Sequence, residues 1–383
     1  MHDDLRLRQI AQARQSVLAG GELAPPLASA WGGRAWLLHS WRRCLAQGRR
    51  PDEALVFNPV PAGAAARLAE AHAALLSAAR AELDRLGALL APIHHFALLT
   101  DAGGTVLAAG GAVDHAEPHA HAIARVGVDL SEDSIGTSAI GAALAEQVPV
   151  WLHRGEHFFR HTSVYSCAGA PLLGPAGECL GMLDVTGVNV PERPELKHLV
   201  AQAALRIEDA LLLARPHRLR LALSWPAARG EAAPPGLLCL DADGGVAGAN
   251  RAAREMLPAL ARPPGAAALH ASDLFAAPWE ALFDQARGED AALVPLWSGL
   301  HVRVAARLSD PRSRPVAARP LKALEKELIH QAVRDAGGRV EVAARALGLS
   351  RATLYRRLAA QRGTEGDGTP RADQGLGHNK KEL

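Results

Sequence analysis

The sequence is poor in aromatic residues, cysteine and lysine. Phenylalanine, tryptophan and tyrosine make up 4% of the 383 residues, and only five of the 42 basic residues are lysines. Because arginine is so frequent everywhere, a single arginine carries little weight as evidence for a binding site. The four cysteines form no C-x-x-C pair, which excludes zinc-finger spacing and favours reduced thiols in a cytosolic protein.

Several functional segments are also missing. The first residues, MHDDLRLRQI, are charged and lack the apolar core of a signal peptide. No uninterrupted apolar run reaches the ~20 residues that a membrane-spanning helix needs. None of the lysines lies in a G-x-x-x-x-G-K-S/T phosphate-binding loop, and there is no G-x-S-x-G or metal-ligand motif. We therefore expect a cytoplasmic protein that is not an enzyme, holds no metal or cofactor, and does not contact a membrane.

The charge that is present is distributed unevenly. The formal net charge is +2, but residues 312–362 contain 12 arginines and lysines against 4 acidic residues, a local charge of +8. The remainder of the chain therefore carries a charge of −6. A basic segment on an acidic body favours a nucleic-acid-binding module near that end of the chain.

Within the basic segment, residues 321–361 have the pattern of three short helices. A first helix has amphipathic spacing from Leu321 to Ala336 and is ended by two glycines. A second runs over about residues 340–346, and Gly348 permits the tight turn that follows it. Ser350 is a suitable N-cap for a third helix over residues 351–360. This arrangement predicts a helix-turn-helix.

The third helix carries the residues we expect to contact DNA. Leu354 and Leu358 are placed to pack inward, whereas the basic and polar side chains lie largely elsewhere, and a helix of this size fits the major groove. The competing interpretation is a plain three-helix domain with a solvated basic face. The predicted contacts to double-stranded DNA are Ser350, Arg351, Thr353, Tyr355, Arg356 and Arg357.

This stretch resembles the Fis-type helix-turn-helix of bacterial enhancer-binding transcription activators. The resemblance rests on the Gly-Gly end of the first helix and on VAARALGLSRATLYRRL. It implies a homodimer, in which the first helix makes the dimer contact and the last helix reads DNA.

The beginning of the chain, residues 1–63, is expected to be a helical leader. Helices are predicted over residues 5–18 and 35–47, and the tryptophans of the second favour docking onto the next domain over nucleic-acid binding. One long helix is then predicted from Ala64 to Leu90, either as a packing helix or as half of a dimer helix pair.

From His94 onward the pattern alternates between strands and helices. A strand, an Asp-Ala-Gly-Gly turn and a second strand come first, followed by a helix over residues 135–147 and a closing helix over 193–214. Three further strands are predicted at residues 148–152, 164–173 and 179–185. The region resembles a GAF domain of the acetoin-catabolism-type activators, on the motifs GVDLSEDSIGTSAIGAAL, Glu-His-Phe and YSCAGAPLLGPAGECLGMLDVTG, with SWRRCLAQGRRPDEA upstream.

A ligand pocket of this domain is expected around residues 151–167, where acid, imidazole, aromatic and thiol groups gather. The predicted pocket residues are Trp151, Glu156, His157, Phe158, His161 and Cys167. His153, His157 and His161 have a spacing that would share a helical face, but structural roles are favoured over metal binding. Ser131, Glu132 and Thr137 are read as capping residues, and Asp184 would need a partner if buried. The resemblance implies an inducer that is a small alcohol, diol, ketone or aromatic.

The remaining segments complete an α+β multidomain chain. Residues 236–308 resemble a smaller PAS-like α+β domain, and a disordered tail is expected at the end. Relatives with this N-terminal domain carry an AAA+ ATPase before the helix-turn-helix, where this sequence has only a short linker. The predicted order is leader 1–63, GAF-like sensor domain 64–215, linker 216–235, PAS-like domain 236–308, linker 309–320, all-α Fis-type helix-turn-helix 321–362 and tail 363–383.

Together these features predict a dimeric DNA-binding transcription regulator controlled by a small-molecule effector and without ATPase activity. RNA polymerase or a related activator would be a further partner. The alternative is a non-ATPase interaction protein that modulates a full-length enhancer-binding activator.

Overall fold

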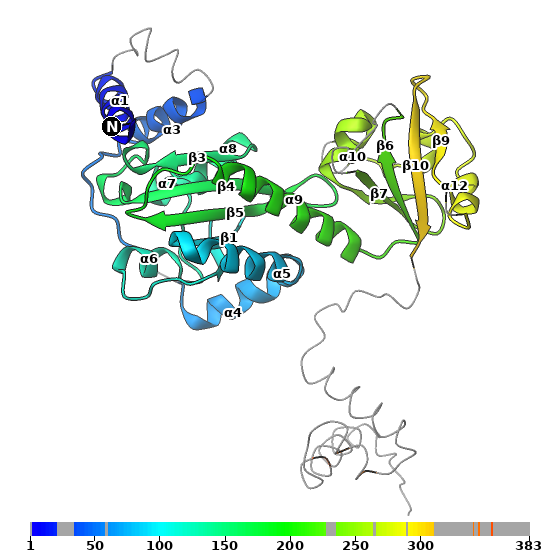
Figure 1. Cartoon of the computed structure of the whole chain (residues 1–383), viewed down its shortest axis with the longest axis horizontal. Helices are drawn as coiled ribbons and strands as arrows, with labels where there is room; N and C mark the ends of the chain where they lie inside the picture. The colour runs from blue at the N-terminus through cyan, green and yellow to red at the C-terminus, as the bar shows by residue number, and fades with distance from the viewer. Residues whose placement is uncertain are drawn as a thin grey trace, which may run out of the picture. The chain divides into compact units, whose positions relative to one another are not determined.

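The computed structural model describes residues 2–20, 34–57, 60–226, 235–262, 266–288 and 290–309, together with positions 340, 344 and 354 (Figure 1). The chain divides into two compact units, Met1–Pro315 and Val316–Leu383. In the second unit the three described positions are helical, and Leu354 is fully buried, as its predicted inward packing requires. The predicted DNA contacts, the linker at 309–320 beyond Ser309, and the tail lie outside the described residues.

The first domain is built on a five-stranded antiparallel sheet with strand order β2-β1-β5-β4-β3. The predicted mixture of strands and packed helices is confirmed. Strand alternation divides the apolar residues between two faces: Phe96 and Leu98 of one strand join one core cluster, whereas Ala97 and Leu99 join the other. The strands are β1 (His95–Asp101), β2 (Val106–Gly110), β3 (Val150–His153), β4 (Tyr165–Leu173) and β5 (Cys179–Val188).

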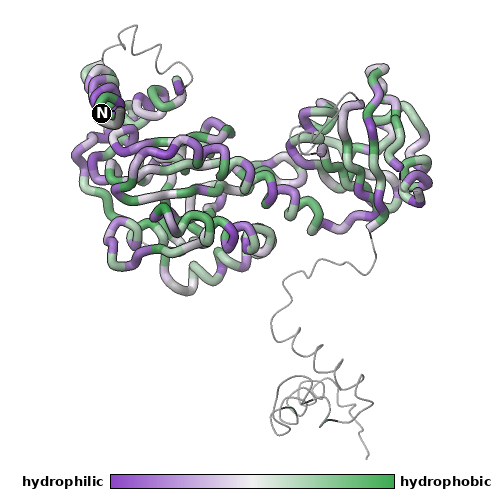
Figure 2. Tube along the Cα trace, viewed as in Figure 1, coloured by the Kyte–Doolittle hydropathy of each residue, from purple (hydrophilic) through white to green (hydrophobic). Residues whose placement is uncertain are grey.

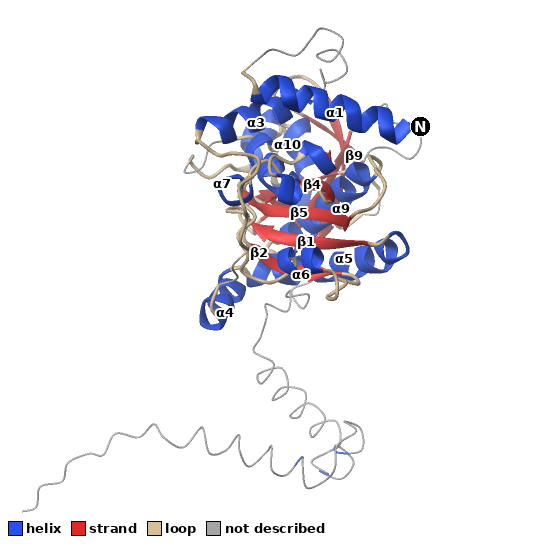
Figure 3. Cartoon of the chain, turned by 90° about the vertical axis from the view of Figure 1, so that its left-hand side faces the viewer, coloured by secondary structure: helices blue, strands red, loops and turns tan. Residues whose placement is uncertain are grey.

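Helices cover both faces of this sheet. Helices α5 (Ala73–Leu90) and α9 (Leu196–Ala214) pack on one face. On the other face lie α6 (Pro118–Ile123), α7 (Glu132–Ile135) and α8 (Ala139–Glu146). Helix α3 (Ala35–Ala46) packs on α8, and α1 (His2–Leu18) packs on α3. Figure 3 shows α1 and α3 side by side, and α5 next to β1 and β2.

The N-terminal helices dock on the sheet domain, as the tryptophans suggested. Trp41 is 1% exposed, and its indole Nε1–H donates to the carbonyl of Glu156 at 2.8 Å. Ile10 and Val17 of α1 join the same core cluster. The leader is therefore packed into the first domain.

Two predicted helices are each interrupted. The segment 64–90 was expected to form one helix, but α4 (Ala62–Ala71) ends at His72, whose backbone leaves the helical region before α5 begins. The helix predicted over 135–147 is also divided, because Gly136 takes a positive φ of 64° between α7 and α8. A Cβ on Gly136 would lie 2.8 Å from the Phe159 ring, so the break also allows close packing.

A second five-stranded antiparallel sheet follows, with order β8-β7-β6-β10-β9. One prediction is wrong here: strand β6 (Leu219–Ser224) lies inside the predicted linker 216–235 and pairs with both β7 and β10. Its leucines at 219, 221 and 223 are fully buried. The other elements are β7 (Gly236–Leu240), β8 (Val246–Ala249), α10 (Arg251–Met256), α11 (Ala271–Leu274), α12 (Glu280–Gln285), β9 (Ala292–Pro295) and β10 (His301–Leu308).

Hydropathy follows this architecture. In Figure 2 hydrophobic stretches follow the strands of both sheets, and the turns between them are more hydrophilic. The second sheet buries its apolar face under α10, α11 and α12, where Leu257, Phe275 and Leu282 complete the core.

Candidate ligand-binding site

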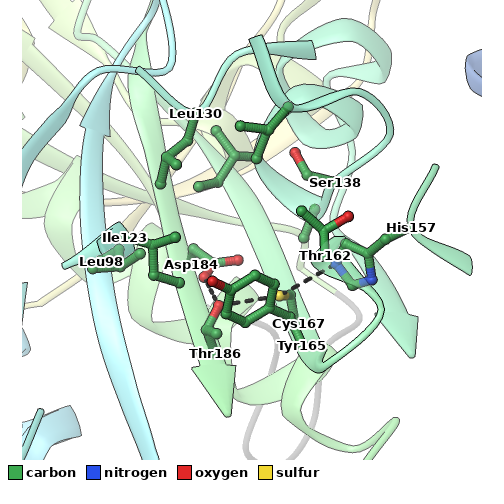
Figure 4. Close-up of a pocket in the computed structure, with 13 residues that line it drawn as sticks. Leu98, Ile123, Leu130, Ser138, His157, Thr162, Tyr165, Cys167, Asp184 and Thr186 are labelled. Atoms are coloured by element: carbon green, nitrogen blue, oxygen red, sulfur yellow. Dashed lines mark hydrogen bonds between the residues drawn. The ribbon is translucent and has the colours of Figure 1, made fainter. Parts of the chain in front are cut away.

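A small cavity lies in the first domain between the sheet and the helices α6, α7 and α8 (Figure 4). Its volume is about 20 Å³, and its lining is mostly apolar. A cavity of that size has room for about one water molecule. The lining residues are Leu98, Ile123, Leu130, Ile135, Ser138, Ala139, Ile140, His157, Thr162, Tyr165, Cys167, Asp184 and Thr186.

Strand register brings the polar groups of the cavity together. Cys167 on β4 is paired with Thr186 on β5, and Asp184 is paired with Leu98 on β1. Because alternate residues of a strand face the same side, Asp184 and Thr186 both point toward the helices that carry the other wall. Figure 4 shows Cys167, Asp184 and Thr186 close together, with His157 and Thr162 approaching from the opposite segment.

Asp184 is the acidic group of the cavity and is 1% exposed. Its Oδ2 accepts a hydrogen bond from the Thr186 hydroxyl, whereas Oδ1 has no partner. Burial raises the pKa of Asp184 to about 7, although the bond from Thr186 acts in the opposite direction. The sequence indicated that this residue would need a partner, and only one of its two oxygens has one.

His157 and Cys167 form a neutral pair beside Asp184. His157 Nδ1 lies 3.0 Å from the Arg154 carbonyl, which can only accept, so Nδ1 carries the proton and Nε2 faces Cys167 Sγ at 3.6 Å. Burial lowers the pKa of His157 to about 4 and raises the pKa of the Cys167 thiol well above its ordinary value. A protonated thiol is a poor nucleophile. The arrangement is therefore suited to binding an uncharged molecule.

Of the six predicted pocket residues, His157 and Cys167 line the cavity and the other four do not. Glu156 is fully buried, but it forms ion pairs with Arg6 at 2.5 Å and Arg34 at 2.6 Å. Its role is to join the N-terminal helices to the sheet domain. The remaining three are Trp151, which stacks under Arg34; Phe158, which packs edge-on against Phe159; and His161, which contacts Phe57 and His119.

The predicted histidine face does not form. His153 is the last residue of β3, and its Nδ1 lies 2.6 Å from Ser166 Oγ. His157 follows the short 3-10 helix η3 (Arg154–Glu156). His161 lies in a second short 3-10 helix, η4 (Arg160–Thr162). Within the described part of the chain, no group of three or more histidine, cysteine or acidic residues is arranged to hold a metal ion.

The residues read as caps have structural roles. Ser131 caps α7, and Glu132 accepts hydrogen bonds from Arg43 and Ser40. Thr137 is not a cap: its hydroxyl lies 2.6 Å from that of Ser40, and the cap of α8 is Ser138. The cavity residues that sequence reasoning missed include Ser138, Thr162, Tyr165 and Thr186. The alternation of LDVTG was a usable signal, since it places Thr186 on the face of Asp184.

The described residues define a class of protein with two α+β domains, the first of which has a small, mostly apolar cavity between its sheet and its helices. Residues 8–209 match the family described as "MimR, N-terminal domain", and residues 320–360 match "Bacterial regulatory protein, Fis family". The first match covers more than half of the chain. The chain belongs to this family of acetoin-catabolism-type bacterial regulators, in a form that lacks the central AAA+ domain, and the predicted resemblance is confirmed.

Curated relatives point the same way. The chain is 32% identical over 294 residues to the acetoin catabolism regulatory protein of Cupriavidus necator. This match covers 74% of the present chain and 43% of that protein. It is 28% identical over 174 residues to the acetoin dehydrogenase operon transcriptional activator of Bacillus subtilis, covering 44% and 28%. The chain thus spans less than half the length of these relatives.

Among solved structures, the chain is similar to the E. coli DhaR(N)–DhaL complex, with 15% sequence identity and a TM-score of 0.44. The match covers 72% of this chain and 99% of that one. In the described residues of the present chain, no helix is both long and apolar enough to cross a membrane.

Proposed function

We propose that this protein is a cytoplasmic, dimeric DNA-binding transcription regulator whose occupancy of DNA is controlled by a small molecule bound in the cavity of the first domain. The effector is an alcohol, diol, ketone or aromatic, and regulation proceeds without ATP hydrolysis. The observation that carries the proposal is the coexistence, in one chain, of a Fis-family match at residues 320–360 and a buried cavity with an unpaired polar group.

The charge distribution supports DNA as the partner. The local charge of +8 over residues 312–362 adjoins an otherwise acidic chain. Neutralisation of phosphates by such a segment releases counterions, so DNA affinity should fall steeply with salt concentration. A recognition helix contributes base contacts in addition.

The cavity supports a binding role for the first domain. It lies between a sheet and three helices, and burial favours the uncharged forms of its polar groups, since it lowers the pKa of His157 and raises the pKa of Asp184 to about 7. A ligand that prefers one arrangement of this domain would shift the equilibrium between dimer arrangements, and so the spacing of two recognition helices.

The test is a gel-retardation titration with DNA from the promoter region adjoining the gene, at several salt concentrations. The triple variant Arg351→Ala, Arg356→Ala and Arg357→Ala should lose retardation. At low salt, where the weakened binding can still be followed, loss of three phosphate contacts should reduce the slope of log affinity against log salt by about 3. A matched control removes three exposed arginines of the first domain, Arg8→Ala, Arg42→Ala and Arg67→Ala, and should bind DNA like the parent protein.

Unchanged DNA affinity of the recognition-helix variant would refute the DNA-binding proposal. The missing phosphate-binding loop favours one alternative, a partner that modulates a full-length activator. Co-purification with such an activator, together with no retardation by the parent protein, would support that alternative.

A further inference from the structure

The cavity of the first domain has one open hydrogen-bonding position, Oδ1 of Asp184. The residue is 1% exposed, and this oxygen has no partner. Leaving a buried polar atom unpaired is costly, and such atoms are uncommon in folded proteins. An unpaired oxygen that lines a cavity therefore indicates where a bound molecule makes its hydrogen bond.

The other polar groups of the cavity already have partners. Tyr165 Oη donates to the His119 carbonyl at 3.1 Å, and Thr162 Oγ1 donates to the Phe159 carbonyl at 3.0 Å. Ser138 Oγ accepts from the backbone of α8. Among the described cavity residues, Asp184 alone has a buried side-chain oxygen or nitrogen without a hydrogen bond.

We infer that the cavity binds a small uncharged molecule through a hydroxyl group, which hydrogen-bonds to Oδ1 of Asp184. This inference rests on the proposed function and names the chemistry of its effector site. A hydroxyl group can donate to a carboxylate and can also accept from a carboxylic acid, whereas a ketone oxygen can only accept. A hydroxyl therefore fits Asp184 in either protonation state.

The surroundings of Asp184 disfavour a charged ligand. The titratable groups that line the cavity with it are His157, Cys167 and Tyr165. Burial disfavours the charged form of each, since it lowers the pKa of His157 and raises those of Cys167 and Tyr165. The rest of the lining is aliphatic or carries hydroxyl groups that already have partners. A ligand with a hydroxyl at one end and a short carbon chain matches this lining.

Binding of any molecule larger than water requires one wall to move, because the cavity holds only about 20 Å³. The wall formed by β1, β4 and β5 is fixed by the ladder of the sheet. The opposite wall includes Ile123 at the end of the six-residue helix α6 and His157 and Thr162 on the segment of η3 and η4. We expect entry of a ligand to displace this second wall, which couples binding to a change of shape.

The experiment compares ligands of equal carbon skeleton by calorimetry with the full-length protein at pH 8. The panel is 2-butanol, butanone and 2-aminobutane, together with 2,3-butanediol and butanedione. We expect the alcohols to bind at least 10-fold more tightly than the matching ketones, because a hydrogen bond to a carboxylate adds affinity that a carbonyl cannot supply.

Asp184→Asn provides the decisive variant. The Thr186 hydroxyl also lies 3.1 Å from Cys167 Sγ, but a thiol sulfur is a weak acceptor. The amide oxygen should therefore take the place of Oδ2 as the acceptor of Thr186 and turn the amide N–H groups toward the cavity. The variant should therefore lose at least 10-fold in affinity for the alcohols and gain affinity for the ketones. The control Asp284→Asn removes an exposed carboxylate of the second domain and should leave both affinities unchanged.

A reversal of preference cannot come from an unfolded variant, so it separates specificity from stability. Equal affinities of alcohol and ketone for the parent protein, or an Asp184→Asn variant with unchanged affinities, would overturn the inference. Tighter binding of 2-aminobutane would overturn it by assigning a cation site. Failure of every ligand to bind would also overturn it, while retardation of DNA by the parent protein would leave the DNA-binding part of the proposed function standing.

Discussion

At the scale of single residues, two buried carboxylates of the first domain have opposite surroundings. Glu156 faces the guanidinium groups of Arg6 and Arg34, and it also accepts the backbone N–H of His153. Asp184 has the hydroxyl of Thr186 and no cation, and its pKa is raised to about 7 by burial. Glu156 therefore joins the N-terminal segments that hold Arg6 and Arg34 to the sheet domain, whereas Asp184 has one oxygen without a hydrogen bond.

The raised pKa of Asp184 makes stability depend on pH. In an unfolded chain an aspartate releases its proton near pH ~3.9. Between that pH and about pH 7 the folded protein binds more protons than the unfolded one, so rising pH destabilises it by about 1.4 kcal/mol per unit. The stabilisation by protonated Asp184 is fully present below the pKa of aspartate in the unfolded chain, and it is lost as the pH rises through the pKa of Asp184 in the folded protein. Asp184→Asn does not titrate, so the free energy of unfolding of the parent minus that of the variant should fall from pH 4 to 7.

Urea unfolding of both proteins at half-unit pH intervals measures this difference. His157 has a lowered pKa and contributes the opposite slope, since its stabilisation is lost as the pH falls below its ordinary range. That slope is common to both proteins and cancels in the subtraction. A difference that stays constant from pH 4 to 8 would show that Asp184 is already ionised in the folded protein at low pH.

The sequence identified the neighbourhood of the site better than its residues. His157, Cys167 and the need of Asp184 for a partner followed from local patterns. Glu156 looked like a pocket acid because its partners, Arg6 and Arg34, are more than 100 residues away in the chain. No local pattern predicts an ion pair over such a separation, and so its structural role could not be inferred.

At the scale of elements, α5 lies very close to the end of β2. An added Cβ on Gly87 would lie 2.7 Å from the backbone of Gly111, and one on Gly110 would lie 2.9 Å from the Leu83 carbonyl. Both distances are shorter than a normal van der Waals contact, so the backbone of either the helix or the strand would have to shift to make room for the added Cβ. The glycines at this crossing are therefore required for the helix to pack against the sheet.

Gly87→Ala should accordingly destabilise the protein by about 1–3 kcal/mol, as overpacked sites do, even though alanine is the better helix former by about 1 kcal/mol. The matched control is Gly63→Ala in α4, where an added Cβ would meet nothing nearer than Arg67 Nη1 at 4.0 Å. That variant should be unchanged or up to about 1 kcal/mol more stable. Thermal and urea unfolding measure both, and equal effects of the two substitutions would contradict the packing argument.

The sequence predicted helices and strands well where a regular apolar pattern continues over many residues. It failed where a helix is broken or a strand stands between linker-like stretches. Helices α3 and α9 and strands β4 and β5 agree closely with the sequence pattern. Strand β6 was missed because its alternating LRLALS stands between proline- and arginine-rich stretches. The break at His72 was missed because alanine-rich sequence supports a continuous helix, and its interruption depends on tertiary packing.

At the scale of the whole molecule, the domain built on the second sheet contacts the turn between β4 and β5, two of the strands that line the cavity. The β4–β5 turn receives hydrogen bonds at the Pro175 carbonyl from Arg254, at 2.5 Å, and from the Ala249 N–H. On α9, Glu208 is 3% exposed and pairs with Arg251 at 2.6 Å. Since β4 and β5 hold Cys167 and Asp184, the strands that form the fixed wall of the cavity are joined directly to the second domain.

A double-mutant cycle on Glu208 and Arg251 tests how firmly this contact joins the two domains. Burial raises the pKa of Glu208 despite the pairing with Arg251, which shows that its desolvation is substantial. Arg251→Met leaves that carboxylate buried without its cation and should cost about 3 kcal/mol. Glu208→Gln keeps an acceptor for the Leu173 N–H and should cost less. The double variant should recover part of the loss, giving a coupling energy of about 1–3 kcal/mol in urea unfolding.

The exposed pair Arg287 and Asp284 supplies the reference, because its side chains are 77% and 68% accessible. A cycle on that pair should give a coupling energy below about 0.5 kcal/mol. If the Glu208–Arg251 cycle gave no more than the exposed pair, this ion pair would not hold the domains together. The contact would then rest on the other hydrogen bonds between the domains, among them those of Arg254 and Ala249 to the Pro175 carbonyl and that of Asn250 to Asp209. A large coupling energy would instead make α9 and α10 parts of one rigid connection between the two sheet domains.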